Sequence, residues 1–402
     1  MSSVSALRRF DAISPAPPDA ILGLTEAFVA DDRTQKMNLS VGVYKDADGV
    51  TPILRCVKAA EQRILETESS KGYLSIDGLP DYRDAVRELV FGDLIDSDRI
   101  AVVQTPGGTG AVRVAADFVA DQCAGAQVWL PNPTWANHNA IMAAAGLSVE
   151  SYRYLSADRR GLDFDAVIED LQTKPNPGDA ILLHACCHNP TGVDPSAEQW
   201  SHIAEVIADR HLLPILDFAY QGFGDGLMED TAGLRAVLSR SDEALVCTSF
   251  SKNFGLYSER VGAVSVVASS TETASAALSQ VKRLVRSNYS NPPRHGAAIV
   301  ATVLNDADLR SDWQVELEAM RCRILDLRQR FVSGMDATDC DQDFSFLLGQ
   351  KGMFSFSGLN RMQVDELRVQ HGIYIVDSGR INVAGMSEDR MGFLCDAVAS
   401  VL

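Results

Sequence analysis

Residues 100–122 read IAVVQTPGGTGAVRVAADFVADQ, which places an apolar run, a glycine-rich turn and a helical pattern in direct succession. The run Ile100–Gln104 predicts a β-strand, and Ala111–Gln122 predicts a helix. A strand followed by a helix is the repeating element of βαβ units, which build sheets whose strands run parallel.

The same alternation continues to residue 267. Further strands are predicted at Val128–Leu130, Val149–Leu155, Ala180–Ala185, Leu212–Asp217, Ala244–Ser249 and Val261–Val267, and further helices near Ala197–Arg210 and Leu234–Ser239. The sequence therefore predicts an α/β fold with a mostly parallel central sheet flanked by helices.

A second, smaller α+β domain is predicted near the C-terminus. From Asp308 to Leu327 apolar residues recur at every third or fourth position, which is typical of one long amphipathic helix. Beyond it, Met353–Ser357 and Tyr374–Val376 predict short strands, and Asp389–Val401 predicts a closing helix. We expect residues 49–315 to form the large domain, residues 316–402 the small domain, and residues 1–48 an N-terminal arm and part of the small domain.

Three prolines in the first 20 residues predict that this arm is extended, because each lacks a backbone donor and excludes a helix. Arms of this kind often lie on a partner subunit.

The chain carries 36 basic and 54 acidic residues, a formal net charge of −18 at pH 7. This charge repels phosphate backbones and anionic lipid surfaces, so neither nucleic acid nor a membrane is an expected partner. No stretch approaches the roughly 18 consecutive apolar residues of a membrane span, and no signal peptide is recognisable. A cytoplasmic location is therefore expected.

The eight cysteines include no CxxC pair and are spread too thinly for a disulfide framework, so reduced thiols are expected. The run Cys186-Cys187-His188 could suggest a metal site. Adjacent residues on an extended chain point to opposite faces, however, and rarely share an ion, so no metal is predicted.

Polar residues follow five of the predicted strands, at the carboxyl edge where open α/β sheets bind their ligands. At Thr105–Gly110, free backbone N–H groups and a helix dipole converge and suit a phosphate. This segment lacks the GK[ST] of a P-loop and the third glycine of GxGxxG, which disfavours nucleoside triphosphates and dinucleotides. Trp135 and Asp217 follow two other strands, and an aspartate that ends a buried strand is costly unless a cationic group meets it.

Lys252 follows the strand Ala244–Ser249. Phe250 and Phe254 flank it in sequence and Arg260 follows, surroundings that would lower the pKa of its amine by desolvation and by repulsion. A lysine with a lowered pKa is a nucleophile suited to Schiff-base formation. Together with a phosphate cradle, a buried aspartate and an aromatic side chain, it provides what pyridoxal 5′-phosphate (PLP) requires.

Nine motifs spread over nearly the whole chain form a recognisable set: SVGVYK (40–45), GYL (72–74), GGTG (107–110), NPTW (132–135), HNPTG (188–192), DFAYQG (217–222), SFSK (249–252), RSNYSNPP (286–293) and SGR (378–380). With these motifs the chain resembles the class I aminotransferases of PLP fold type I, and most closely the bacterial aspartate aminotransferases.

The resemblance implies three catalytic residues. Lys252 would bind PLP covalently and, once displaced by substrate, would move protons as general acid and base. Asp217 would keep the pyridine nitrogen protonated, and Tyr220 would bond the phenolic oxygen. The other cofactor contacts that the resemblance implies are Gly108, Thr109, Trp135, Asn189, Ser249, Arg260 and the partner subunit's Tyr73.

Two arginines define the substrate that the resemblance implies. Arg380 would bind the α-carboxylate in a bidentate pair, and the partner subunit's Arg286 would bind the distal carboxylate, which suits a four- or five-carbon dicarboxylate. Gly42, Trp135 and Asn189 would help to position it. The implied protein is a homodimer with shared active sites that transfers the amino group of L-aspartate to 2-oxoglutarate, giving oxaloacetate and L-glutamate.

The related aromatic-amino-acid aminotransferases are the main alternative, because they share both arginines. Five positions of this chain match the aspartate pattern by resemblance: Val43, Lys45, Thr51, Thr109 and Asn291. Gly72 departs from the asparagine usual in bacterial aspartate enzymes. We therefore expect aspartate to be preferred, with weaker turnover of aromatic substrates. A β-lyase and a PLP-binding regulator without catalysis are further alternatives, and the charge of −18 disfavours the regulator.

Overall fold

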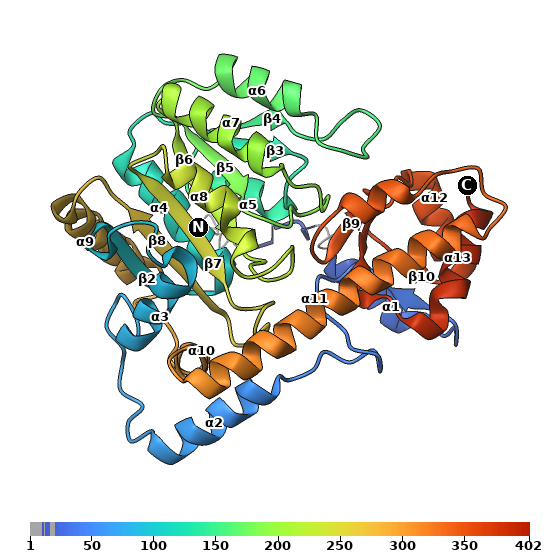
Figure 1. The fold of residues 1–402 in the computed structure, drawn as a ribbon, viewed down its shortest axis with the longest axis horizontal. Helices are drawn as coiled ribbons and strands as arrows, with labels where there is room; N and C mark the ends of the chain where they lie inside the picture. Colours follow the sequence, from blue (N-terminus) through green and yellow to red (C-terminus); the bar gives the residue numbers. More distant parts are fainter. Residues whose placement is uncertain (1–9, 12, 17–20) are drawn as a thin grey trace, which may run out of the picture.

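The computed structural model describes residues 10–11, 13–16 and 21–402, which form two lobes joined by one long helix (Figure 1). Most of the predicted extended arm, residues 1–20, lies outside the described residues. Within the described part of the chain, the larger lobe holds a seven-stranded sheet and the smaller lobe holds two short sheets. The predicted α/β fold with a smaller α+β unit is therefore confirmed.

The sheet of the larger lobe is mostly parallel. Its strand order is β2 (Ile100–Pro106), β8 (Val261–Val267), β7 (Ala244–Ser249), β6 (Leu213–Phe218), β5 (Ala180–His184), β3 (Val128–Asn132) and β4 (Val149–Arg153). Among these strands only β8 runs against its neighbours. All seven predicted strands are present, with ends shifted by no more than two residues. Because the other six strands share one direction, the segments that follow them meet at one edge of the sheet.

Helices cover both faces of this sheet (Figure 1). Along β5, Ile181 and Leu183 belong to one apolar cluster and Leu182 belongs to the other, so both faces of the strand are buried. This double burial explains why the strands read as continuous apolar runs. One face is covered by α4 (Gly107–Gln122), α5 (Ala136–Ala144) and α9 (Thr271–Asn288), and the other by α6 (Phe164–Thr173), α7 (Ala197–Asp209) and α8 (Ala232–Leu238).

Three more helices extend the larger lobe beside β2 and the joining helix: α2 (Arg55–Thr67), α3 (Pro80–Phe91) and α10 (His295–Leu304). Among the described residues, no helix combines the length and the apolarity that crossing a membrane requires.

The joining helix, α11 (Ala307–Asp336), begins where the Asp306 side chain accepts a hydrogen bond from the backbone N–H of Leu309. Its buried side chains recur along one face, which confirms the predicted amphipathic helix. Trp313 contacts the larger lobe, where its Nε1 donates to the Asn253 carbonyl at 2.7 Å. Arg328, nearer the other end, donates from Nη2 to the Gly352 carbonyl of the smaller lobe at 2.7 Å. One helix therefore supports both lobes.

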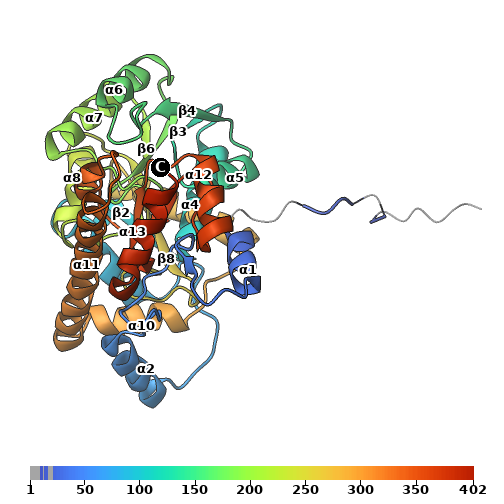
Figure 2. The ribbon, with the colours of Figure 1, turned by 90° about the vertical axis from the view of Figure 1, so that its right-hand side faces the viewer.

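The smaller lobe is assembled from both ends of the chain. Strand β1 (Met37–Asn38) pairs in parallel with β10 (Ile373–Tyr374), and β9 (Phe354–Phe356) pairs antiparallel with β11 (Arg380–Asn382). Figure 2 views this lobe from the front, with α12 (Arg361–Glu366), α13 (Met391–Ser400) and α1 (Leu22–Ala30) around it. The predicted strands at β9 and β10 and the closing helix are confirmed, whereas β1 and β11 were not predicted.

Candidate functional site

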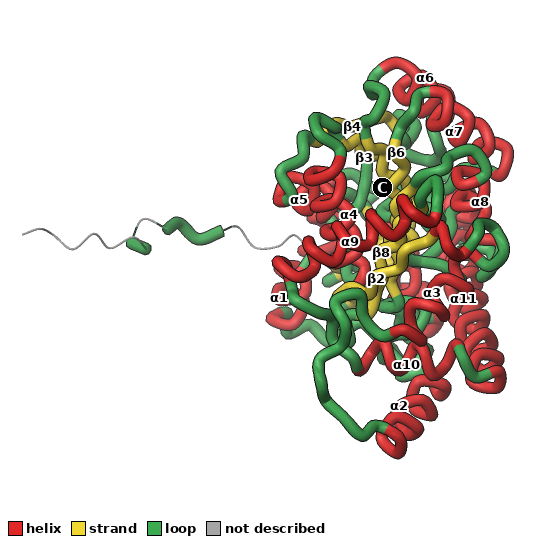
Figure 3. The backbone as a smooth tube through the Cα atoms, turned by 90° about the vertical axis from the view of Figure 1, so that its left-hand side faces the viewer, coloured by secondary structure: helices red, strands yellow, loops and turns green. Residues whose placement is uncertain are grey.

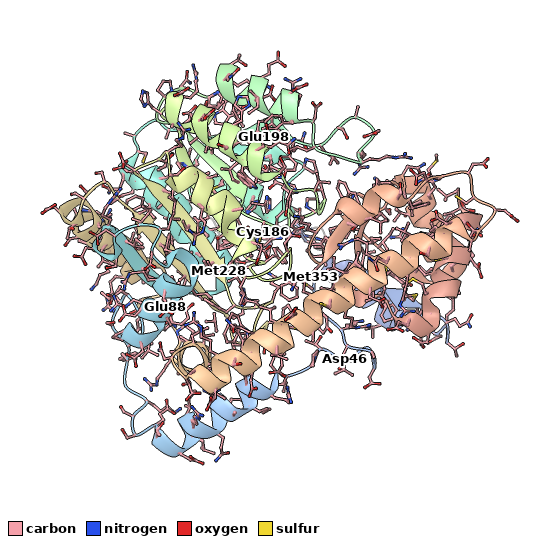
Figure 4. All side chains as sticks on the ribbon, viewed as in Figure 1. Asp46, Glu88, Cys186, Glu198, Met228 and Met353 are labelled. Carbon is pink, nitrogen blue, oxygen red and sulfur yellow. The ribbon has the colours of Figure 1, made fainter. Side chains whose placement is uncertain are left out.

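A cavity of about 190 Å³ lies at the carboxyl edge of the larger sheet, between the two lobes. Figure 4 labels Cys186 and Met353, which mark where side chains of the two lobes approach each other. The cavity is lined by Ile21, Gly42, Gly108, Thr109, Trp135, Asn189, Asp217, Ala219, Tyr220, Ser249, Ser251, Lys252, Tyr257, Arg260, Phe354 and Arg380. Every predicted site residue is in this set except Tyr73 and Arg286.

One end of the cavity has features that suit an anion. Helix α4 begins at Gly107 rather than at the predicted Ala111, so the glycine-rich segment is the first turn of the helix and presents its free N–H groups. A Cβ at Gly107, whose φ is +74°, would lie 2.5 Å from Nη2 of Arg260. A Cβ at Gly108 would lie 3.0 Å from that of Ser249. Glycine thus leaves room for a guanidinium beside the helix N-terminus.

Arg260 is held in this position by its own hydrogen bonds. Its Nη1 donates to the Ser251 hydroxyl at 3.3 Å and to the Tyr257 carbonyl at 3.0 Å. Neither acceptor is a carboxylate, so the positive charge remains available to an anion in the cavity.

Asp217 is the next-to-last residue of β6, and its carboxylate is buried at the bottom of the cavity. Its Oδ2 lies 3.0 Å from Nε2 of His138, whose Nδ1 lies 2.8 Å from the Thr134 hydroxyl. Burial alone would raise the pKa of Asp217, but the hydrogen bond and the charge interaction with His138, helped by Lys252, hold it below its ordinary value. No described residue donates a hydrogen bond to the other oxygen, Oδ1. The site therefore offers an ionised carboxylate with one oxygen unused.

Lys252 presents a buried amine to the cavity. Its Nζ lies 4.9 Å from the centre of the Tyr220 ring, and no described residue accepts a hydrogen bond from it. Burial lowers the pKa of Lys252 to about 8; the charge of Arg260 acts in the same direction and that of Asp217 opposes it. The lowering expected from the sequence is present. At pH 7 roughly one amine in ten is then neutral and nucleophilic.

Tyr220, Asn189 and Trp135 complete the wall around this amine. Burial raises the pKa of Tyr220 well above its ordinary value, so its hydroxyl remains a hydrogen-bond donor. The Asn189 Oδ1 accepts from Nη1 of Arg380 at 3.4 Å. The Trp135 ring meets the His138 ring edge-on, with 5.1 Å between their centres.

Arg380 is the second cation of the cavity, and it is 5% exposed. Its guanidinium lies 4.3 Å above the Phe354 ring, and its Nη2 donates to the Ser40 carbonyl at 2.6 Å. Its Nε has no partner, and no described carboxylate pairs with it. Burial lowers the pKa of Arg380 to about 10. Because a buried charge without a counter-charge is costly, this group is suited to a carboxylate ligand.

Gly42 packs against the Phe354 ring, the same ring that supports the Arg380 guanidinium. A Cβ at Gly42 would lie 2.5 Å from Cζ of Phe354, so only a residue without a side chain fits against that ring.

Tyr73 and Arg286 do not reach the cavity of their own chain. Tyr73 is 96% exposed, on the segment between α2 and α3 that arcs away from the larger lobe (Figure 3). Arg286 lies near the end of α9, exposed, with Nη1 donating to the Ser290 hydroxyl at 2.5 Å. Their contribution to the site of a partner subunit stays a prediction.

Five residues of the cavity were not predicted from the sequence: Ile21, Ala219, Ser251, Tyr257 and Phe354. Tyr257 lies five residues beyond Lys252 in the same loop, so its nearness to a recognised motif was an available signal. Phe354 lies in a predicted strand that is far from the motifs, so no such signal was available for it. The contact between His138 and Asp217 was also not predicted from the sequence.

The expectation of an extended chain at the adjacent cysteines is wrong. Cys187 has a φ of +51°, a left-handed conformation that brings its sulfur, the Cys186 sulfur and an oxygen of Asp230 within 4.8 Å of one another. The Asp230 carboxylate already accepts backbone N–H groups from four residues: Gly222, Gly224, Asp225 and Gly226. The Asp230 carboxylate therefore stabilises the turn formed by residues 222–226. All eight cysteines are free thiols.

Comparison with known proteins shows where this architecture occurs. The family of class I and II aminotransferases matches residues 34–398. The aspartate aminotransferase of Haemophilus influenzae is 52% identical over 396 residues, which cover 98% of this chain and 100% of the relative. The aromatic-amino-acid aminotransferase of Pseudomonas aeruginosa is 46% identical over 398 residues, covering 98% and 99%.

A crystal structure of the aromatic-amino-acid aminotransferase of Burkholderia pseudomallei, covalently bound to pyridoxal phosphate, is similar with a TM-score of 0.95 at 46% identity. The similarity covers 98% of this chain and 99% of that one. The matched residues 34–398 include every strand of the larger sheet and of the two short sheets, and the chain belongs to the class I and II aminotransferases.

Proposed function

We propose that the chain is a PLP-dependent aspartate aminotransferase, which transfers the amino group of L-aspartate to 2-oxoglutarate and gives oxaloacetate and L-glutamate. The observation that carries the proposal is the composition of one cavity. It contains an anion cradle at Gly107–Gly108, a buried amine at Lys252, and a buried guanidinium at Arg380 with which no described carboxylate pairs. The name of the relative at 52% identity supports the choice of aspartate.

The cavity fits PLP at each functional group of the cofactor. The first turn of α4 and Arg260 suit its phosphate, since the missing Cβ of Gly107 leaves the guanidinium in place. The unused Oδ1 of Asp217 suits the ring nitrogen, and the amine of Lys252 suits the aldehyde. The remaining cofactor contacts are proposed as Gly108, Thr109, Trp135, Asn189, Tyr220, Ser249 and the partner subunit's Tyr73. When bound, PLP supplies an electrophilic aldehyde and an electron-withdrawing ring.

Three side chains carry the proton chemistry in this proposal. The Lys252 amine would act as the general base and then the general acid for the proton on the substrate Cα. The ionised Asp217 would hold a proton on the ring nitrogen, which would favour loss of the Cα proton. The Tyr220 hydroxyl, which stays protonated, would donate a hydrogen bond to the phenolic oxygen.

Substrate recognition depends on two arginines. Arg380 binds the α-carboxylate and so neutralises its own buried charge, with Gly42, Asn189 and Trp135 around the amino acid. The partner subunit's Arg286 binds the distal carboxylate. This assignment makes the active form a homodimer with shared sites, in the cytoplasm. In it, residues 49–315 form the large domain and residues 316–402 the small one, with residues 1–48 as arm and part of the small domain.

Aromatic-amino-acid transamination is the second candidate, because a relative with that name is 46% identical over nearly the whole chain. The two candidates differ in the group that faces Arg286, not in the group that faces Arg380.

The deciding experiment compares kcat/KM for L-aspartate and L-phenylalanine with 2-oxoglutarate as acceptor, on protein whose bound PLP is first shown by its visible absorbance. We expect aspartate to be preferred. A preference for phenylalanine would select the aromatic activity, and a protein that binds no PLP would contradict both.

A further inference from the structure

We propose that Tyr257 is a positioning residue for the amino-acid substrate: its hydroxyl fixes the backbone of residues 40–44, the segment that places Gly42 in the cavity. The identity of the substrate as a dicarboxylate depends on the proposed function. The role of Tyr257 in holding the segment does not.

Tyr257 contacts both ends of the cavity that it lines. Its hydroxyl oxygen accepts the backbone N–H of Tyr44 at 2.9 Å, and its carbonyl oxygen accepts Nη1 of Arg260 at 3.0 Å. One residue thus touches the anion cradle through its backbone and the substrate side through its side chain.

The segment 40–44 is otherwise held by the smaller lobe. The Asn382 amide donates to the carbonyls of Val41 and Val43 at 2.6 and 2.8 Å, and Arg380 donates to the Ser40 carbonyl at 2.6 Å. Among the described residues of the loops that follow the larger sheet, Tyr257 alone bonds to this backbone. Its hydroxyl therefore fixes the segment to the lobe that carries Lys252.

The position of this segment matters for Arg380. Gly42 lies against the Phe354 ring, where a Cβ would come within 2.5 Å, and the same ring supports the Arg380 guanidinium at 4.3 Å. A shift of residues 40–44 therefore moves both Gly42 and the Ser40 carbonyl that orients Arg380. Loss of the Tyr257 hydroxyl should loosen the carboxylate site without removing a group that touches the reacting atoms.

The Tyr257 hydroxyl accepts a hydrogen bond and holds the backbone of residues 40–44 in place; it does not act as a base. Burial raises the pKa of Tyr257 to about 12, so the group stays protonated at neutral pH. This agrees with a role that acts through geometry.

The first test measures amide hydrogen exchange in the holoenzyme without substrate. Tyr257→Phe removes only the hydroxyl, so exchange in peptides that cover residues 40–45 should become about three- to tenfold faster. Tyr152→Phe is the matched control, because the Tyr152 hydroxyl is also buried and also bonds to backbone, the Leu182 carbonyl at 2.9 Å, but lies outside the cavity. This control should leave exchange at residues 40–45 unchanged.

The second test measures ligand affinities. Succinate, a dicarboxylate that lacks the reacting amino group, should bind Tyr257→Phe about three- to tenfold more weakly, read from tryptophan fluorescence. The KM for aspartate should rise by a similar factor, with kcat changed less than about twofold. PLP should be retained as in the wild type, because the carbonyl that orients Arg260 is unaffected.

Unchanged exchange at residues 40–45 in Tyr257→Phe would overturn the proposal whatever the activity. Equal losses of PLP and succinate affinity would overturn it too, since the hydroxyl would then serve the cofactor end. A wild type that does not turn over aspartate would contradict the proposed function alone, because the exchange experiment would still report on Tyr257.

Discussion

Nε2 of His138 lies 3.0 Å from Oδ2 of Asp217, and both side chains are buried. Because the Thr134 hydroxyl can donate to Nδ1, the imidazole can present its proton to the carboxylate through Nε2. This hydrogen bond, together with nearby positive charge, holds the pKa of Asp217 below its ordinary value, so the buried carboxylate stays ionised. Its free oxygen can hold a proton on a ring nitrogen in the cavity.

Replacing the Asp217 carboxylate with a neutral amide should remove most of the transaminase activity. Asp217→Asn keeps the shape of the side chain but cannot hold the ring nitrogen protonated, so kcat should fall by about 10²-fold or more. The measurement is kcat at saturating aspartate. Asp179→Asn is the control, because Asp179 is also buried and accepts from Trp129 Nε1 at 3.0 Å, but it does not line the cavity. A variant Asp217→Asn with more than half of the wild-type kcat would contradict the assignment.

The lowered pKa of Lys252 predicts the pH dependence of cofactor attachment. Covalent binding of PLP to apoprotein, trapped with borohydride, should speed up as pH rises to about 8 and then level off. An ordinary lysine would continue to gain reactivity up to about pH 10.4. A rate that keeps rising above pH 9 would contradict a lowered pKa.

The lowered pKa of Lys252 also predicts the direction in which the stability of the apoprotein changes with pH. Between the folded pKa of about 8 and the higher unfolded value, the unfolded chain binds more protons at Lys252, so the free energy of unfolding of the apoprotein should increase with pH. Urea unfolding of wild type and Lys252→Met at several pH values isolates this contribution. The wild-type stability relative to Lys252→Met should rise from pH 8 to 10, and a fall would be the wrong sign.

Arg380→Lys should affect all amino-acid substrates alike. Lysine keeps the charge but loses the planar pair of donors, so kcat/KM should fall by about 10²-fold for aspartate and for phenylalanine. Arg361→Lys, at an exposed site in the same lobe, is the control. A loss confined to aspartate would show that Arg380 binds the distal carboxylate instead.

Shared sites can be tested by mixing two inactive variants. Arg286→Ala lacks the proposed distal contact and Lys252→Ala lacks the amine, so a mixed dimer contains one site with both groups intact. With random pairing about half of the dimers are mixed, and about a quarter of the wild-type aspartate activity should return. If mixing restores nothing although mixed dimers are present, Arg286 acts within its own chain or not at all.

The cradle can be tested by a matched pair of glycines. Gly107 and Gly125 both have positive φ, +74° and +82°, so alanine strains the backbone at either position. Only at Gly107 does the new Cβ displace the Arg260 guanidinium, since nothing lies within 4 Å at Gly125. Gly107→Ala should weaken PLP binding at least about tenfold and Gly125→Ala should not. Equal PLP affinities of the two variants would contradict a role of Arg260 in binding the phosphate.

The larger sheet could be predicted because its strands are buried on both faces, so that each strand is a continuous apolar run in the sequence. The start of α4 was placed four residues late because glycine is a poor helix former, and Gly107–Gly110 read as a turn. Strands β1 and β11 are two and three residues long, too short to show a period, and pairing with distant segments defines them.

The candidate site could be predicted where motif residues lie at the carboxyl end of a strand or just after it, as Asp217 and Lys252 do. The contacts of Tyr257 with Tyr44, and of Phe354 with Arg380, join segments far apart in sequence. No local pattern encodes such contacts, so they required the structure. Tyr73 and Arg286, which the resemblance assigns to the site of a partner subunit, do not line the cavity of their own chain.

The pairing of β1 with β10 has a consequence for how this protein is made. Met37 and Asn38 leave the ribosome long before their partners Ile373 and Tyr374 are translated. At about 5–20 residues per second, the first strand waits on the order of tens of seconds for its neighbour. Arg380 is added later still, so a nascent or truncated chain can complete the sheet of the larger lobe without being able to capture an amino acid.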